Sequence, residues 1–423
     1  MRNFFLNFCA LLVLSFFFFP FELVIIPGAN SKMILAAVGV VMLIYNSSIR
    51  RDASVDKGLF VIILYALIVS LSGLLSVICN HTSDYSYASY FMSMAVWLAA
   101  AYVVITVVKV VHTGVTVRLI CNYLVVLCVV QCVLALLIDS FPFLSSIVSK
   151  IMVVTPAMEG RLYGIDASLD IAGTRFSAIL IMLVHCLLCG KGKADNTFGY
   201  NLWNIFAFII ISIVGNMISR TTLVGVILAI LYFVYIWVRG TSLRVRKIAL
   251  IFVSILMLVV PIISLLYRVN HDFHDHLRFG FEGFFAWAET GQWETNSNNI
   301  LLDMIVFPDN LKTWIIGDGY FANPYHTDPY YVGPKTGGFY MGTDIGYLRF
   351  IFYFGLIGLS AFVLYFIRIV VELCGRYPEY KAMFIVLLLL NFIIWFKVST
   401  DIFVVFALFI CLGETDEEEI EAL

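Results

Sequence analysis

A series of apolar runs, most of them 13 to 23 residues long and almost free of charge, constrains this chain most. A bilayer span needs about 20 such residues. Hydrophobic residues make up 62% of the sequence and charged residues 13%, so a water-soluble fold would have too little polar surface to cover itself. We therefore expect an all-α polytopic membrane protein, with residues 1–423 in a single integral membrane domain.

Matched against the length that a bilayer requires, the apolar runs predict about twelve transmembrane helices. The first run resembles the core of a signal peptide, but it lacks a small-x-small cleavage site and continues through Pro20, so we expect it to be a retained anchor. The predicted spans are 4–26, 33–45, 59–79, 90–108, 119–138, 171–189, 201–216, 221–238, 248–267, 343–371, 382–396 and 402–412.

Lysine and arginine predict the orientation of these spans, because cytoplasmic loops carry an excess of them. They fall in alternate loops, whereas the loop at 80–89 has none. Both termini are then cytoplasmic, including the acidic tail Glu414–Glu421. The basic residues of the cytoplasmic loops are Arg50, Arg51, Lys57, Lys109, Arg118, Lys191, Lys193, Arg239, Arg244, Arg246, Lys247, Arg376 and Lys381.

Two long loops face the other side, a smaller one at 139–170 and a larger one at 268–342. Long irregular connections are usually functional or disordered. The larger loop is rich in Trp, Tyr, Pro and Gly, so we expect it to be folded. It should contain helices near Leu277–Glu289 and Asn298–Phe307, the second capped by Asn296/Ser297, and a turn at Gly317–Tyr320 within an irregular flap.

Arginines are unusually frequent on this non-cytoplasmic side. The guanidinium group suits planar, multi-donor contact with phosphate oxygens, so several converging arginines would form an anion site. The alternative is that each one snorkels to the interface or pairs with a carboxylate. The arginines concerned are Arg161, Arg175, Arg220, Arg268, Arg278 and Arg349.

Asp344 and His326 are the candidates for a general base. Asp344 is expected at the start of a span, where a helix N-terminus favours its charge, and it could act beside an anion-binding arginine. Alternatively, Asp344 and Thr343 cap that helix. His326 lies in the flap between two polar residues, and it competes with Asp344 for the role.

Metal binding is not expected. The run His271–His276 contains three histidines, but their spacing does not define a helical metal site. A solvent-exposed loop explains these histidines equally well. The nine cysteines are scattered through apolar segments and none lies in the large loop, so no disulfide framework is expected. Nucleic-acid binding is also disfavoured, because no compact basic face exists outside one short loop.

Three segments together carry a resemblance to a known family. They are Ile218-Ser219-Arg220-Thr221 after a hydrophobic span, Trp314-Ile315-Ile316-Gly317-Asp318-Gly319-Tyr320 in the large loop, and Thr343-Asp344-Ile345-Gly346-Tyr347-Leu348-Arg349 leading into Tyr353-Phe354-Gly355-Leu356-Ile357-Gly358. In their order and spacing, and in the layout of spans and loops, the chain resembles the O-antigen and capsular polysaccharide polymerases of the Wzy type.

The resemblance implies a GT-C-like glycosyltransferase of the bacterial inner membrane with its active site facing the periplasm. Such an enzyme transfers a glycan from undecaprenyl diphosphate to the non-reducing end of another lipid-linked repeat unit. Arginines would replace a metal in stabilising the diphosphate, so no cofactor is implied. The implied partners are the lipid-linked oligosaccharide, membrane lipid and a chain-length regulator protein.

The predicted site follows from the residues and from this resemblance. The catalytic candidates are Arg220, Arg278, Asp344 and His326. The substrate-binding candidates, which include loop aromatics able to stack on sugars, are Arg161, Arg175, Arg268, Arg349, Tyr320, Tyr325, Tyr347 and Trp314.

The chain departs from the family pattern at two places. In some members, ten residues separate a periplasmic Arg from the Gly that follows it. In this chain the separation is one residue longer, both from Arg161 to Gly173 and from Arg268 to Gly280. O-antigen ligases place a His-Asn pair where this chain has Thr343-Asp344, which favours a polymerase over a ligase. A ligase acting on lipid A core and a transporter or flippase of lipid-linked sugars are the alternatives, although transporters usually show internal repeats that this chain lacks.

Overall fold

The computed structural model describes residues 2–50, 57–189, 197–239, 243–328, 331–336 and 338–413. In these ranges the chain is helical, with only isolated bridging pairs in place of strands. Among the described residues, eight helices are long and apolar enough to cross a bilayer, which is the architecture of a polytopic membrane protein. They are α3 (Lys57–Asn80), α4 (Tyr90–Val111), α5 (Val117–Ser140), α7 (Leu169–Cys189), α8 (Phe198–Ile218), α9 (Thr222–Arg239), α10 (Leu243–Val269) and α15 (Gly346–Arg376).

The other predicted spans overlap helices that are not among these eight, so the total of twelve stays a prediction. These helices are α1 (Arg2–Phe18), α2 (Ser31–Arg50), α16 (Lys381–Ile394) and α17 (Phe403–Leu412). The first span was expected to reach Ile26, but α1 ends at Phe18. Pro20 has no N–H with which to continue the helical ladder, and the segment after it turns back so that Glu22 bridges Asn30. The acidic tail Glu414–Glu421 lies outside the described residues.

The chain forms two compact units. Unit 1 comprises Met1–Leu35, Tyr102–Trp293 and Leu412–Leu423, and unit 2 comprises Ala36–Ala101 and Glu294–Cys411. The large loop predicted at 268–342 is therefore divided between the units after Trp293. Each unit is described by itself below.

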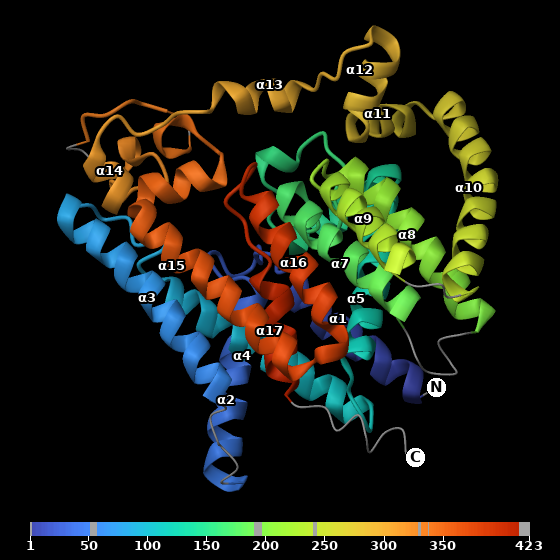
Figure 1. The fold of residues 1–423 in the computed structure, drawn as a ribbon, viewed down its shortest axis with the longest axis horizontal. Coiled ribbons are helices and arrows are strands. Elements are labelled where there is room, and N and C mark those ends of the chain that lie inside the picture. The colour runs from blue at the N-terminus through green and yellow to red at the C-terminus, as the bar shows by residue number, and fades with distance from the viewer. Residues whose placement is uncertain are drawn as a thin grey trace. The chain divides into compact units, whose positions relative to one another are not determined.

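In unit 1, α7 is the central helix and is buried along almost its whole length. It packs against α5, α8 and α9, and α10 stands at the edge of this bundle with little of its surface covered (Figure 1). After α5 comes the short helix α6 (Pro142–Ile151), and after α10 come α11 (His271–Gly280) and α12 (Glu282–Thr290).

In unit 2, α3 and α15 form the most extensive helix pair, and the short helix α14 (Leu311–Ile316) packs on the beginning of α15 (Figure 1). The helix α13 (Asn296–Asp303) precedes α14. The irregular flap that follows contains the single turns η3 (Pro324–His326) and η4 (Tyr340–Gly342), and its ends are joined where Ala322 bridges Phe339.

The helices predicted within the large loop exist, with different boundaries. Leu277–Glu289 was expected to be one helix, but the chain breaks at Phe281 between α11 and α12. The cap predicted at Asn296/Ser297 is wrong by one residue, because the side chain of Thr295 accepts the N–H of Asn298. A β-branched Thr hydroxyl caps a helix nearly as well as Ser or Asn, so the choice among three adjacent candidates was decided by the local backbone.

A break in α15 shapes unit 2. At Gly355 the backbone takes φ +66°, a conformation that residues with a side chain rarely adopt. The break leaves the carbonyls of Phe352 and Tyr353 without their helical donors. The N–H of Asp318 donates to Phe352 O at 2.6 Å and the N–H of Gly319 to Tyr353 O at 3.0 Å.

Side chains of helix α3 form further hydrogen bonds at this break. The hydroxyl of Ser76 also donates to Tyr353 O, at 2.7 Å, and the Asn80 side chain donates to the carbonyl of Gly317 at 3.0 Å. The predicted turn at Gly317–Tyr320 therefore supplies backbone donors to a broken span. After the break, residues 356–376 can still cross the bilayer, since 21 helical residues (376 − 356 + 1) extend about 32 Å.

Gly355→Ala is expected to destabilise the protein strongly. A Cβ at this position would lie 2.2 Å from the backbone of Ile315, and the positive φ adds strain of about 1–3 kcal/mol. Gly375→Ala, in the same helix with open space around it, is the matched control. Thermal unfolding of the detergent-solubilised variants measures both, and equal melting temperatures for the two would contradict this account.

Candidate functional site

The turn between α8 and α9 organises one end of unit 1. The carboxylate of Asp170, in the first turn of α7, accepts hydrogen bonds from the hydroxyls of Ser219, at 3.3 Å, and Thr221. The Asn216 side chain donates to the carbonyl of Gly280, the last residue of α11, at 2.6 Å. Two helices distant in the sequence are thus bound to the turn that carries Arg220.

Two glycines make these close approaches possible. A Cβ on Gly173 would lie 2.5 Å from the Ser219 hydroxyl, and a Cβ on Gly280 would lie 2.9 Å from the carbonyl oxygen of Asn216. These are the glycines whose spacing from Arg161 and Arg268 is one residue longer than the family pattern. In this structure both serve to seat a helix on the Arg220 turn.

Phe279 brings two of the predicted arginines together. The guanidinium carbon of Arg220 lies 4.6 Å from the centre of the Phe279 ring and that of Arg161 lies 5.6 Å from it. Cations are attracted to an aromatic face at such distances. Arg220 also forms an ion pair with Glu282 at the start of α12.

An open pocket of about 870 Å³ lies beside these arginines. It is formed by the end of α5, by α6, by the loop that leads to α7 and by one face of α11. Its lining combines carboxylates, one guanidinium, one imidazole and two aromatic rings. The lining residues used below are Asp139, Glu159, Arg161, Tyr163, Asp272, Asp275, His276 and Phe279.

The loop that carries Arg161 and Tyr163 is held by a buried side chain of α5. Gln131 accepts the N–H of Ile165 at 2.9 Å and donates to the carbonyl of the same residue at 3.2 Å. A buried amide that satisfies both groups of one loop residue fixes that loop against the span. The pocket wall is therefore anchored to the membrane helices.

The face of α11 toward the pocket carries Asp272, Asp275, His276 and Phe279, a spacing that places side chains on one side of a helix. The imidazole Nε2 of His276 lies 3.2 Å from a carboxylate oxygen of Asp139 at the end of α5. The three histidines of this segment therefore do not act as one group, because His276 turns to the pocket while the others contact Asp275.

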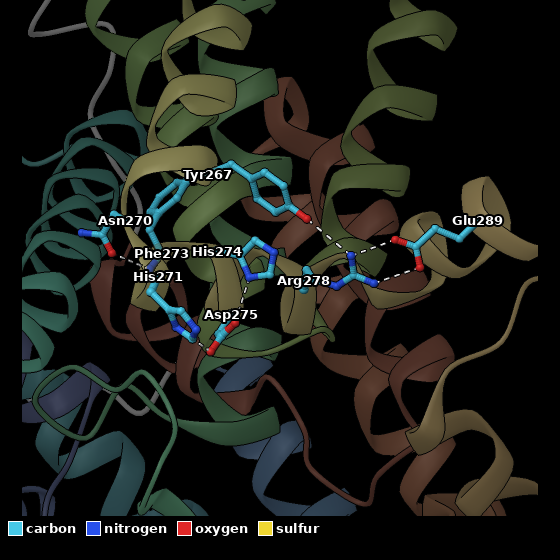
Figure 2. Close-up of polar contacts among 8 residues, drawn as sticks. All are labelled: Tyr267, Asn270, His271, Phe273, His274, Asp275, Arg278 and Glu289. Carbon is cyan, nitrogen blue, oxygen red and sulfur yellow. Dashed lines mark hydrogen bonds and ion pairs between the residues drawn. The ribbon is translucent and has the colours of Figure 1, made fainter.

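Further polar contacts of α11 form a network that includes Asp275, at the edge of the pocket face (Figure 2). His274 contacts Asp275 at 2.8 Å, and this hydrogen bond is the main cause of a lowered pKa for the Asp275 carboxyl. Figure 2 shows Arg278 between Tyr267 of α10 and Glu289 of α12, with two hydrogen bonds to the carboxylate at 2.8 and 2.9 Å. The bond from Arg278 likewise lowers the pKa of Glu289.

The remaining predicted arginines of unit 1 are apart from the pocket. Arg175 is buried in α7, where its guanidinium carbon lies 5.8 and 5.4 Å from the rings of Phe18 and Phe19. Arg268 is exposed near the end of α10 and makes no polar contact with the described part of the chain. The structure therefore brings together Arg161, which lines the pocket, and Arg220, which shares the Phe279 ring with it; Arg175, Arg268 and Arg278 are not among the lining residues.

In unit 2, Asp344 and Arg349 form an ion pair at 3.3 Å. Arg349 also donates to the Ser399 hydroxyl at 2.8 Å, and its guanidinium carbon lies 3.7 Å from the ring centre of Phe321. Asp344 does not cap α15, whose N-cap is Ile345 with no side-chain bond. The alternative that arginines pair with carboxylates thus describes Arg349, as it does Arg220 and Arg278.

The predicted aromatic residues of unit 2 take part in its packing. The Tyr320 hydroxyl donates to Asp328 at 2.9 Å, and burial followed by this bond raises the pKa of Tyr320 to about 12. Lys335 lies 4.1 Å from the ring centre of Tyr325, and the Tyr347 hydroxyl donates to Phe392 O at 2.9 Å. Trp314 donates its indole N–H to Pro308 O at 2.9 Å.

His326 lies in η3 by its backbone, and its side chain is outside the described residues. Within the described chain, no three His, Cys, Asp or Glu side chains are grouped as a metal ion would require. None of the nine cysteines forms a disulfide bond.

The comparisons with known proteins identify no relative. No protein-family model matches the chain, and neither a curated protein nor a solved structure is significantly similar to it.

The pocket-lining residues that were absent from the predicted site include Asp139, Glu159, His276 and Phe279. Glu282, the partner of Arg220, and the buried Asp166 were absent from it as well. Asp139 could have been found, because it is a carboxylate at the end of a predicted span. A charge in that position is costly unless it has a partner or contacts solvent. His276 had been considered only as one of three metal ligands. Phe279 carried no signal, because its partners Arg161 and Arg220 come from segments distant in the sequence.

Asp166 is expected to give the protein a pH-dependent stability. Burial raises the pKa of this carboxyl from 3.8 to about 6, and Arg175 partly opposes the shift. A raised acid pKa favours the folded state most when the group is protonated. Protonated Asp166 therefore contributes up to about 3 kcal/mol to the free energy of unfolding. This contribution is fully present below pH 4 and is lost as the pH rises through 6.

Asp166→Asn should remove this dependence. Thermal unfolding at pH 4, 5, 6 and 7 measures it, with the exposed Asp303→Asn as a control. A variant at position 166 that follows the wild-type pH curve would contradict the assignment.

Proposed function

We propose that the protein is a membrane glycosyltransferase that polymerises a surface polysaccharide. The observation that carries the proposal is the pocket of unit 1, which combines carboxylates, an imidazole and aromatic rings beside Arg161, in the loop before α7, and Arg220, in the turn after α8. A lipid-linked glycan presents its sugars and its diphosphate at this level of a bilayer. The likeness to Wzy-type polymerases in the three sequence segments supports the same conclusion.

The lining suits sugars. Carboxylates accept hydrogen bonds from hydroxyl groups, and the rings of Tyr163 and Phe279 offer apolar faces. Pockets that bind small molecules measure about 300–1,000 Å³, which includes this one at about 870 Å³.

The charges distinguish two parts of the site. Asp139, Glu159, Asp272 and Asp275 would repel a diphosphate, so the pocket itself suits the hydroxyl-bearing acceptor. The diphosphate of the donor is better placed at Arg220 and Arg161 around Phe279. Guanidinium groups there would stabilise the charge that develops as the lipid diphosphate leaves.

In the proposed reaction, a hydroxyl oxygen of the acceptor repeat unit forms a bond to the anomeric carbon of the donor glycan. The bond from that carbon to the diphosphate breaks, and undecaprenyl diphosphate leaves with the electron pair. The hydroxyl proton passes to a base. We propose a GT-C-like arrangement of about twelve spans in the bacterial inner membrane, with the pocket facing the periplasm, both termini cytoplasmic and a chain-length regulator as a partner.

The first test is complementation of a strain that lacks this gene. We expect deletion to leave glycans of a single repeat unit and the wild-type chain to restore a ladder of long glycans on a gel. Unchanged ladders in the deletion strain would overturn the proposal, and loss of attachment to lipid A core with normal polymer would favour a ligase instead.

Arg220→Ala is expected to abolish long glycans, because loss of one charge-stabilising donor typically slows a reaction by about 10²–10³-fold. Glu282→Gln separates binding from structure, since it removes the carboxylate that pairs with Arg220 and leaves the guanidinium in place. Glycan length and the amount of inserted protein are measured for both. If Glu282→Gln were as defective as Arg220→Ala, Arg220 would serve the ion pair rather than the substrate.

Polymerisation by the purified protein is expected to be insensitive to chelators, because arginines supply the positive charge in the proposed reaction. Activity on lipid-linked repeat units is measured with and without EDTA. Loss of activity with EDTA and its recovery on adding a divalent ion would show that a metal takes part.

A further inference from the structure

Among the described residues, His276 is the one imidazole that lines the pocket. Its contact with a carboxylate determines which ring nitrogen carries the proton. Its Nε2 lies 3.2 Å from Asp139, and both side chains are partly covered, at 18% and 31% exposure. An ionised carboxylate only accepts hydrogen bonds, so the imidazole Nε2 must carry the proton of this contact. In the neutral ring the lone pair is therefore on Nδ1, which makes no hydrogen bond within the described chain.

The position of His276 relative to the arginines fits a proton acceptor. Phe279 follows His276 by three residues on α11, so their Cβ atoms are about 5–6 Å apart on one helix face. The ring of Phe279 is the surface on which Arg161 and Arg220 lie. A proton acceptor and two cations are thus adjacent along a single helix, with the pocket beside them.

The charges that face His276 come from α5, the loop before α7 and α11, whereas α6 lines the pocket with uncharged residues. Asp139 belongs to α5, Glu159 and Arg161 to the loop before α7, and Asp272 and Asp275 to α11 itself. Four carboxylates and one guanidinium thus surround the imidazole in the pocket. The same carboxylates keep the diphosphate away from the base.

We propose that His276, positioned by Asp139, takes the proton from the acceptor hydroxyl in this pocket, which rests on the proposed function. The lone pair of Nδ1 accepts the hydroxyl proton while the oxygen bonds to the anomeric carbon, and the bond to the diphosphate breaks. The products are the extended glycan, the lipid diphosphate and an imidazolium, which then returns its proton to solvent. Asp139 is a positioning residue.

Two features distinguish His276 from the bases expected from the sequence. Asp344 is paired with Arg349, which also donates to Ser399, and it does not line the pocket of unit 1. His276 has a free ring nitrogen in the described chain and lines a cavity large enough for a sugar.

The decisive variant is His276→Gln. Glutamine keeps an N–H donor for Asp139 but cannot accept a proton, so we expect normal insertion and thermal stability with kcat lowered about 10²–10⁴-fold and KM little changed. His271→Ala, on the same helix and 87% exposed, is the matched control and should retain wild-type ladders. His276→Gln with wild-type polymerisation would overturn the proposal.

Asp139→Asn tests the positioning role. An amide can reverse the contact and donate to Nε2, which would move the imidazole proton to Nδ1 and block the base. We expect a lowered kcat and a shifted pH–rate profile, and an unchanged profile would assign Asp139 a structural role only. The wild type is compared in the same deletion strain, so if it fails to restore long glycans the proposed function fails, whereas wild-type ladders with an active His276→Gln variant reject this inference alone.

Discussion

The need to satisfy every backbone group in an apolar environment determines how unit 2 is built. A helix broken at Gly355 leaves carbonyls that neither lipid nor neighbouring side chains of Leu and Phe could bond. Backbone donors at Asp318 and Gly319 and the hydroxyl of Ser76 supply these bonds. The flap is therefore bound to its span by the main chain, and its aromatic side chains pack around that attachment.

In unit 1, the packing of the helices instead holds a charged residue, Arg220, in place at a helix end. Gly173 and Gly280 let two helices approach the turn before α9, and Asp170 and Asn216 bond them there. Arg220 then projects from a turn fixed on two sides, toward the ring of Phe279. Such support from neighbouring elements is what a group that stabilises transient charge requires, because its orientation must precede the reaction.

The sequence predicted the helical membrane architecture well, because apolar runs of span length have few other solutions. It also singled out the turn at Arg220 and the glycine turn at 317–319, since both are short segments with distinctive chemistry. What it did not predict are pairings across sequence distance. The contacts of Asp139 with His276 and of Arg161 with Phe279 depend on how α5, α11 and a loop pack, and no local pattern encodes such packing. The arginines illustrate this limit, since their number suggested an anion site while three of them have carboxylate partners.

The attachment of the flap also has a consequence for biogenesis. Ser76 and the segment Gly317–Gly319 are synthesised before Tyr353, so the donors already exist when the broken span leaves the ribosome. Asn80 and Thr82, which donate to the carbonyls of Gly317 and Gly319, are likewise synthesised before that segment. Each donor is thus synthesised before the carbonyl that accepts its hydrogen bond. The broken span, which would be costly to insert alone, can form these bonds as it enters the membrane.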